Sequence, residues 1–322
     1  MFSIIVPLYN KALYIRHAVD SILSQTFRQF ELIIVNDGST DKSLEVVQGI
    51  NFSGVDVRLI NQPNAGVSTA RNNGVKAAKY DYVAFLDADD WWHPTFLEEI
   101  NRLIHDFPEG AIHASAYYKV KNGVNIPARI GVPKDFERGY FDYCKAYSLS
   151  PWMPLWTGAV VIRKTVFNEM QGFNPRLKLG EDFDLWVRVA LKYKVALINK
   201  PLTYYNQDVS LQWRAVGNLH APETHMLWNL EYLTEEEQKN PVLKQLLDNL
   251  RVGSLLPYYL NKTTRQQAKM ELAKVDWSKQ PQATEKMYKL PLFYLKIKQG
   301  ILQYGYLIKQ KLLHPEYYSN IH

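Results

Sequence analysis

Residues 82–90 read Tyr-Val-Ala-Phe-Leu-Asp-Ala-Asp-Asp, an apolar run that ends in three carboxylates. The run from Tyr82 to Leu86 predicts a short buried strand. Three carboxylates within four residues repel one another unless a cation neutralises them. Mg²⁺ and Mn²⁺ prefer oxygen ligands, typically one or two carboxylates together with phosphates. The stretch therefore predicts a metal site at a strand end, with a solvated acidic turn before the helix near Pro94 as the alternative.

Strand and helix patterns alternate on both sides of this stretch. The predicted strands are Phe2–Val6, Glu31–Val35, Val55–Ile60 and Tyr82–Leu86, and the predicted helices are Lys11–Gln25, Val67–Lys79 and one from Pro94. Such alternation predicts an α/β fold with a doubly wound, mostly parallel sheet. The pattern loosens from residue 110, with strand-like pieces at 111–119 and 157–162 and a helix from Glu181 to Tyr193. We expect a catalytic domain over residues 1–210, divided near residue 110, and a helical region over 211–322.

Composition limits the class of protein. The 322 residues are 47% hydrophobic, enough for a large core, and the net charge of +6 suits an anionic small molecule or an anionic membrane surface. No basic patch with interleaved aromatic residues occurs in the first 200 residues, which argues against nucleic-acid binding. Cys144 is the single cysteine, which suits a reducing compartment. The apolar start is a strand rather than a signal peptide, and no run approaches the roughly 20 apolar residues of a membrane span, so we expect a cytoplasmic, at most peripheral, location.

Polar clusters follow three of the predicted strands: residues 7–10 (Pro-Leu-Tyr-Asn), 36–39 (Asn-Asp-Gly-Ser) and 87–90. Ligands of open α/β sheets bind at the carboxyl ends of the strands, so these clusters should converge on one crevice. A fourth cluster covers residues 64–74, where Gly66 opens a helix whose amides favour anions. Arg71 lies one turn further along and would reach a phosphate or brace the acidic cluster, unless it is an ordinary surface cation.

The order and spacing of these four clusters resemble the nucleotide-sugar-binding half of family 2 glycosyltransferases, which have the GT-A fold. The resemblance covers residues 1 to about 110 strongly and 155–205 moderately. It implies that Asp37 accepts an N–H of the base of a UDP- or dTDP-sugar, and that Asp89 ligates the Mn²⁺ or Mg²⁺ bridging the diphosphate. The other implied donor and metal residues are Pro7, Tyr9, Asn10, Gln62, Asn64, Arg71, Asp87 (also a metal ligand) and Asp90.

Residues 180–188 resemble the acceptor-side Glu-Asp motif of the same family. The resemblance implies that Asp182 is the general base and that Glu181 binds the acceptor or orients the base, whereas the alternative is that both acids only complement the helix dipole. Trp186 would be a sugar-stacking platform or part of the core. Family members often carry a His or Arg in a late loop, but residues 204–210 contain neither, and the next cation is Arg214. The absence of a Gln-x-x-Arg-Trp motif favours single addition over processive synthesis.

The sequence thus predicts an inverting, metal-dependent transferase that moves one sugar from a nucleotide sugar to a hydroxyl of a glycan or lipid-linked glycan, as in surface polysaccharide synthesis. A non-catalytic nucleotide-sugar-binding protein is the alternative. A nucleotidyltransferase would carry a Gly-rich loop after the first strand, where this chain has Tyr-Asn-Lys. Residues 286–315 contain six lysines, no acidic residue and an apolar stripe, so they predict either an interfacial helix on an anionic membrane or a helix that packs on the catalytic domain. The stripe consists of Phe293, Ile297, Ile301, Tyr304 and Ile308.

Overall fold

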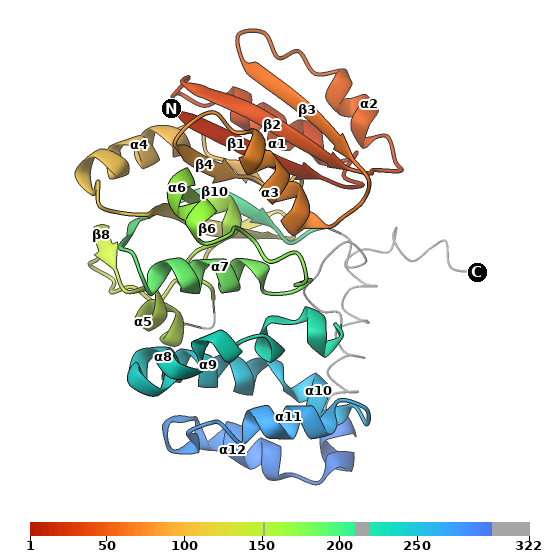
Figure 1. Ribbon diagram of the computed structural model, residues 1–322, viewed down its shortest axis with the longest axis vertical. Coiled ribbons are helices and arrows are strands. Elements are labelled where there is room, and N and C mark those ends of the chain that lie inside the picture. Colours follow the sequence, from red (N-terminus) through yellow and green to blue (C-terminus); the bar gives the residue numbers. More distant parts are fainter. Residues whose placement is uncertain (151, 210–218, 298–322) are drawn as a thin grey trace. The chain divides into compact units, whose positions relative to one another are not determined.

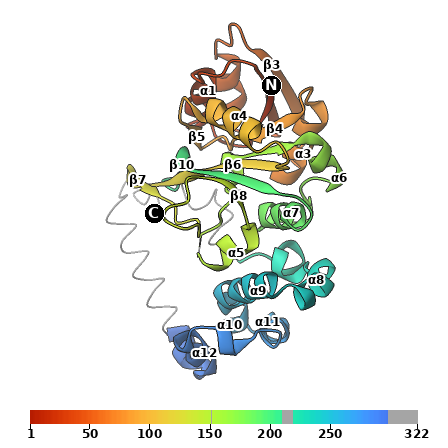
Figure 2. The ribbon, with the colours of Figure 1, turned by 90° about the vertical axis from the view of Figure 1, so that its left-hand side faces the viewer.

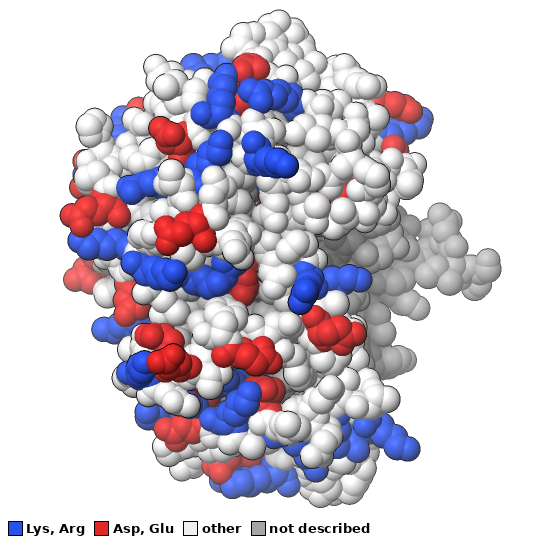
Figure 3. Space-filling view, in the orientation of Figure 1, with Lys and Arg blue, Asp and Glu red and all other residues white. Residues whose placement is uncertain are grey.

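The structure, a computed structural model, describes residues 1–150, 152–209 and 219–297. The chain divides into two compact units, Met1–Leu243 and one that begins at Lys244 (Figure 1). No helix in the described part of the chain combines the length and apolar character needed to cross a membrane. On the face drawn in Figure 3, basic side chains are interspersed with acidic ones, so the excess positive charge is not gathered into one patch there.

Four parallel strands form the first half of the sheet in the order β3-β2-β1-β4. They are β1 (Phe2–Leu8), β2 (Phe30–Asp37), β3 (Asp56–Gln62) and β4 (Tyr82–Phe85), joined by α1 (Ile15–Leu23), α2 (Ser43–Gln48) and α3 (Val67–Ala77). Every residue of β1 and β2 is buried, as expected for strands that are covered on both faces. The predicted doubly wound α/β arrangement is confirmed for this half.

The two faces of this half are covered by different helices. One core layer joins alternate residues of β1 and β2 to the apolar stripes of α1 and of α4 (Phe96–Asp106). The other face takes α3, where Gly74 lies directly against Ile5 of β1. These layers fix the strand order, and the register then pairs Leu8 with Asn36 and Asp37 with Gln62. Polar residues of neighbouring strands therefore end at the same edge.

The second half of the sheet is mixed and continues in the order β9-β6-β10-β5. Its strands are β5 (Trp91–Trp92), β6 (Ile112–Lys121), β9 (Val160–Arg163) and β10 (Val195–Asn206), with β7 (Val124–Pro127) paired to β6 and β8 (Arg138–Phe141) paired to β10. The sequence did not predict β10. Its pairing with β6 shifts register around Pro201, and that irregularity hides the apolar pattern.

The remaining elements of the first unit follow the sheet. They are α5 (Tyr143–Ser148), η1 (Thr157–Ala159), α6 (Lys164–Glu169), α7 (Glu181–Ala190), η3 (Pro222–Thr224), η4 (Met226–Trp228), η5 (Glu231–Leu233) and α8 (Thr234–Lys239). The helix α7 begins at Glu181 as predicted, and it lies on the face of β6 and β10 opposite to α4 (Figure 2).

The division between the two units falls after Leu243 rather than at residue 210. Residues between 219 and 243 belong to the first unit: the Lys178 amide donates to the Thr224 carbonyl at 2.8 Å, and the Tyr232 hydroxyl donates to Asp184 Oδ1 at 2.8 Å. The predicted boundary at residue 210 differs from this division, because helical composition alone does not reveal these contacts.

The described residues of the second unit form helices joined by short connections, as predicted. It contains most of α9 (Pro241–Ser254), then α10 (Leu256–Leu260), α11 (Arg265–Leu272), η6 (Trp277–Lys279) and α12 (Gln282–Lys289). In the predicted stripe, Phe293 and Ile297 are 58% and 55% exposed. Ile301, Tyr304 and Ile308 lie outside the described residues, as does Arg214.

Candidate active site

Asp37, at the end of β2, is buried and accepts three hydrogen bonds. Gln62 Nε2 and the Ala65 amide donate to Oδ1 at 2.7 and 2.8 Å, and the Gly66 amide donates to Oδ2 at 2.9 Å. A carboxylate offers about four lone-pair sites, so about one remains for a ligand. Asp37 therefore holds the loop that leads into α3, and its predicted contact with the base stays a prediction.

The turn after β2 needs its glycine. Gly38 has a φ of +72°, and a side chain there would lie 2.8 Å from the Asn64 backbone nitrogen. The turn and the exposed Asn64 loop thus approach each other as closely as backbone allows. Gln62 is fixed at its other end as well, because Asn73 Nδ2 donates to its Oε1 at 2.7 Å. The second and fourth polar clusters of the sequence are thereby brought together.

Asn10 joins the loop after β1 to the same turn. It adopts a φ of +51°, its amide donates to Ser39 Oγ at 3.2 Å, and its Oδ1 accepts from the Thr40 amide at 2.8 Å. Pro7 is buried within β1, and Tyr9 is 40% exposed beside this loop. Asn10 thus acts first as a brace, and Tyr9 keeps a ring surface that a ligand can contact.

Arg71 connects the donor side to the acceptor side. Its buried guanidinium donates to Asp87 Oδ1 at 2.7 Å and to Glu181 Oε1 at 3.1 Å. Burial alone would lower the pKa of Arg71, but the two carboxylates outweigh burial and raise it, so the group stays charged. Of the roles predicted for Arg71, the structure shows bracing of the acidic cluster.

The other two carboxylates of the cluster have different partners. Lys11 Nζ lies 2.5 Å from Asp89 Oδ2. Asp90 is buried and accepts from Trp156 Nε1 at 3.0 Å and from the Asn206 amide at 2.8 Å. Burial raises the pKa of both carboxyls, and that of Asp90 rises well above its ordinary value because Asp89 and Asp87 lie nearby. Asp90 thus links the acidic cluster to β10 through its hydrogen bond with Asn206.

The acceptor side is formed by the start of α7. Gly180 precedes this helix with a φ of +84°, and Met226 packs so closely that no side chain would fit there. Asp182 is partly buried and accepts from the Phe183 amide at 2.7 Å. Burial, together with the neighbouring Glu181 carboxylate, raises the pKa of Asp182 to about 7. A carboxylate with such a pKa can exchange protons efficiently near neutral pH.

Trp186 lies in the core. Its side chain is 0% exposed, and its ring meets Phe173 edge-on with centroids 5.6 Å apart. A ring enclosed in this way has no face to offer a sugar. The substrate-binding role considered for Trp186 is therefore corrected to a packing role, because the residue lies on the buried side of α7.

Asp87 and Asp89 have the chemistry of a magnesium or manganese site. Within the described residues no group of three or more His, Cys, Asp or Glu side chains is arranged to hold a metal ion. Mg²⁺ needs no such group, since it usually binds one or two carboxylates and takes its other ligands from water and phosphates. Both carboxylates already face a cation, Arg71 and Lys11 respectively. The two carboxylates therefore match the ligand chemistry of such a cation, and metal binding stays a prediction.

Three residues of the site were not predicted from the sequence: Lys11, Trp156 and Asn206. Lys11 directly follows the first polar cluster and is the one cation there, which was a usable signal. Trp156 and Asn206 stand 66 and 116 residues from Asp90, and nothing local marks them.

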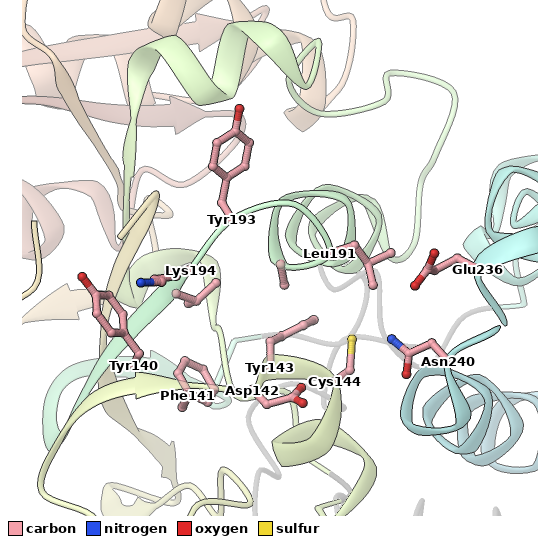
Figure 4. A pocket seen from close by; sticks show the side chains of 12 residues that line it. Tyr140, Phe141, Asp142, Tyr143, Cys144, Leu191, Tyr193, Lys194, Glu236 and Asn240 are labelled. Carbon is pink, nitrogen blue, oxygen red and sulfur yellow. The ribbon is translucent and has the colours of Figure 1, made fainter. Parts of the chain in front are cut away.

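A separate cavity of about 360 Å³ opens beside α5 and contains none of the predicted site residues (Figure 4). Cys144, Glu236 and Asn240 border it. Burial raises the pKa of the Cys144 thiol to about 12, so the thiol stays protonated at neutral pH. This cavity is distinct from the strand-end site.

Known proteins resemble this chain in sequence. The model of glycosyl transferase family 2 matches residues 3–170. Glycosyltransferase GlyA of Streptococcus pneumoniae is 41% identical over 118 residues, which are 36% of this chain and 16% of that protein. The amylovoran biosynthesis glycosyltransferase AmsB of Erwinia amylovora is 29% identical over 291 residues, 78% of this chain and 96% of that protein.

A solved structure shows the same fold. The structure of S. aureus TarS 1–349 in complex with UDP-GlcNAc superposes with a TM-score of 0.70 at 21% identity, covering 92% of this chain and 87% of that one. The predicted GT-A architecture with a helical C-terminal region is thereby confirmed. The match spans only 16% to 39% of the length of seven curated relatives. With its family model matched over residues 3–170 and its fold shared, the chain belongs to the family 2 glycosyltransferases.

Proposed function

We propose that this protein transfers one sugar from a nucleotide-diphosphate sugar, a UDP-sugar, to a hydroxyl of a glycan or lipid-linked glycan. The supporting observation is the continuous network that links four polar clusters: Asn10 to the turn after β2, Asp37 to the loop before α3, and Arg71 to both Asp87 and Glu181. The network brings the polar groups of the strand ends close to Asp182, a carboxyl whose pKa of about 7 suits it to proton transfer.

In the proposed reaction, Asp182 accepts the proton of the acceptor hydroxyl as the acceptor oxygen bonds to the anomeric carbon. The bond from that carbon to the diphosphate oxygen breaks on the opposite side, so the configuration inverts. Glu181, which Arg71 holds at 3.1 Å, orients the acceptor or the base. Asp89 and Asp87 would hold Mn²⁺ or Mg²⁺, which would neutralise charge on the leaving diphosphate.

The donor and the pathway are proposed from the relatives. TarS was crystallised with UDP-GlcNAc and with UDP, and AmsB is named for amylovoran biosynthesis. Uracil fits an acceptor at Asp37, since uracil has an N–H to donate. From the similarity to AmsB we propose that the protein takes part in the assembly of a surface polysaccharide.

The donor class is tested by a thermal-shift screen of nucleotide sugars with Mn²⁺. A ligand that binds only the folded state raises the melting temperature by mass action. We expect UDP-sugars to stabilise the protein more than ADP- or GDP-sugars, and EDTA to reduce the shift. A shift from purine-nucleotide sugars alone would overturn the proposed donor. Slow release of free UDP from the UDP-sugar by the wild-type protein, but not by Asp182→Asn, would identify the protein as an enzyme. No release by either would identify a non-catalytic binding protein.

We also propose that the second unit docks on an anionic membrane surface. The exposed apolar residues Leu290, Phe293, Tyr294 and Ile297 lie close in sequence to Lys286, Lys289 and Lys296. Apolar side chains next to lysines are typical of interfacial segments, and each cation near such a surface adds about 1 kcal/mol. A membrane-bound acceptor would then be within reach.

A further inference from the structure

Lys11 forms the least expected contact of the donor site. Its ammonium group lies 2.5 Å from Asp89 Oδ2, and the two side chains are only 14% and 18% exposed. The other cation of the site, Arg71, is already bound to Asp87 and Glu181. Lys11 therefore neutralises the carboxylate that the proposed metal would use and occupies one of its two oxygens.

The backbone around Lys11 is held in place. The Lys11 amide donates to Ser43 Oγ at 2.8 Å, and the Ala12 amide donates to Asp41 Oδ2 at 3.1 Å. Asn10, the residue before Lys11, is itself held in place: its backbone is left-handed, and its side chain accepts a hydrogen bond from the Thr40 amide. Only the flexible four-carbon stem of Lys11 is free to move the charge. The ammonium can thus leave Asp89 without any change in the loop.

We propose that Lys11 is an exchangeable counter-ion: it neutralises Asp89 in the empty site, yields that carboxylate to the divalent cation, and then binds an oxygen of the donor diphosphate. The inference rests on the proposed function and adds Lys11 to the donor-binding residues.

The exchange follows from charge balance. An ammonium group and a divalent cation that both lie against the Asp89 carboxylate repel each other, so binding of the one weakens binding of the other. An incoming diphosphate supplies the negative charge that the displaced ammonium then needs. Lysine binds phosphate well as a point charge, and its pinned backbone keeps it near Asp89 and therefore near a diphosphate bridged by a metal there.

The proposal predicts opposite effects of one substitution on two ligands. Lys11→Met removes the competitor of the metal, so Mn²⁺ binding without nucleotide should tighten about tenfold. The same change removes a charged hydrogen-bond donor, so UDP binding in EDTA should weaken about tenfold. Isothermal titration calorimetry measures both constants in the full chain. A lysine with only a structural role would weaken both ligands together or neither.

Three further variants keep the test decisive. Lys11→Arg retains the charge, so both constants should stay near the wild-type values. Lys11→Gln repeats the charge removal with a polar side chain and replaces Lys11→Met if that variant does not fold. Asp89→Asn should abolish Mn²⁺ binding and thereby verify that the titrated metal is the one at this carboxylate.

The possible results distinguish failure of the Lys11 exchange from failure of the proposed transferase function. Weaker Mn²⁺ binding in Lys11→Met, or unchanged UDP binding, would overturn the exchange while leaving the transferase function in place. Wild-type protein that binds neither Mn²⁺ nor UDP would overturn the proposed function itself, and the exchange with it.

Discussion

The two halves of the catalytic unit organise their polar residues differently. In the nucleotide half, formed by residues 1–110, Asp37 accepts three hydrogen bonds. Asn10 is hydrogen-bonded to three residues of the neighbouring turn, Ser39, Thr40 and Asp41. In the acceptor half, Asp182 has one short bond to its own helix and a pKa raised by burial. In the proposed function, the first half holds the donor in a fixed place, and the second holds the carboxylate that accepts the proton. Substitutions in the first should alter binding, and those in the second should alter rate.

The largest effect should come from Asp89→Ala, which removes the principal proposed metal ligand. Turnover should fall by roughly a thousandfold or more, because a bound cation stabilises charge in the transition state by several kcal/mol. The metal-dependent part of UDP binding should disappear with it. Steady-state release of UDP measures the rate, with Asp135→Ala as a control for removing a carboxylate elsewhere in the chain. Full activity of Asp89→Ala in EDTA would rule out the metal site.

The next effect should be seen in the acceptor half. Asp182→Asn keeps the size of the side chain but removes the proton acceptor, so the rate should fall by about 10²–10⁴-fold. UDP affinity should change little. Asp182 must be ionised to act as a base, so the wild-type rate should rise as pH passes through about 7, and the variant should lack this rise.

Stability offers an independent check on Asp182. Its pKa is raised from 3.8 to about 7 in the folded protein, so ionisation opposes folding. The opposition is absent below pH 4, grows as pH rises and is complete above 7. Asp182→Asn should therefore raise the melting temperature relative to wild type at pH 8 and not at pH 4. An equal change at both pH values would contradict the raised pKa.

A smaller effect is expected for Asp37→Ala in the nucleotide half. The loop amides of Ala65 and Gly66 would lose their acceptor, and an unpaired polar partner costs about 1–3 kcal/mol. UDP binding should weaken about tenfold, equally with Mn²⁺ and with EDTA. Calorimetric titration of UDP distinguishes this residue from Asp89. A loss confined to the metal-containing experiment would assign Asp37 to the metal rather than to the base.

The smallest effect concerns the second unit and leaves both halves of the site unchanged. A chain truncated after Gln282 should lose a few-fold or more of its binding to vesicles that contain anionic lipid, while it retains UDP affinity. Co-sedimentation at low salt measures the binding, with neutral vesicles as the control. Equal sedimentation of the full and truncated chains would remove the membrane role from this segment.

Local chemistry made the nucleotide half predictable. Three of the four polar clusters there directly follow a mainly apolar strand, so strand ends and site residues could be predicted together. Less of the acceptor half could be predicted, because Pro201 interrupts the apolar pattern of β10 and because parallel and antiparallel strands are mixed there. The contacts that unite the site span long separations: Arg71 meets Glu181 across 110 residues, and Lys11 meets Asp89 across 78. Such pairs depend on packing, which neither composition nor periodicity encodes.

Hydrogen exchange measured by mass spectrometry on the wild-type chain, with and without UDP and Mn²⁺, tests most directly whether the strand-end clusters form one donor site. The account predicts slower exchange in four separate segments, residues 8–12, 37–41, 62–71 and 86–90, with residues 140–146 beside the cavity of Figure 4 unchanged. Protection at that cavity instead, or unchanged exchange in all four segments at saturating ligand, would contradict it.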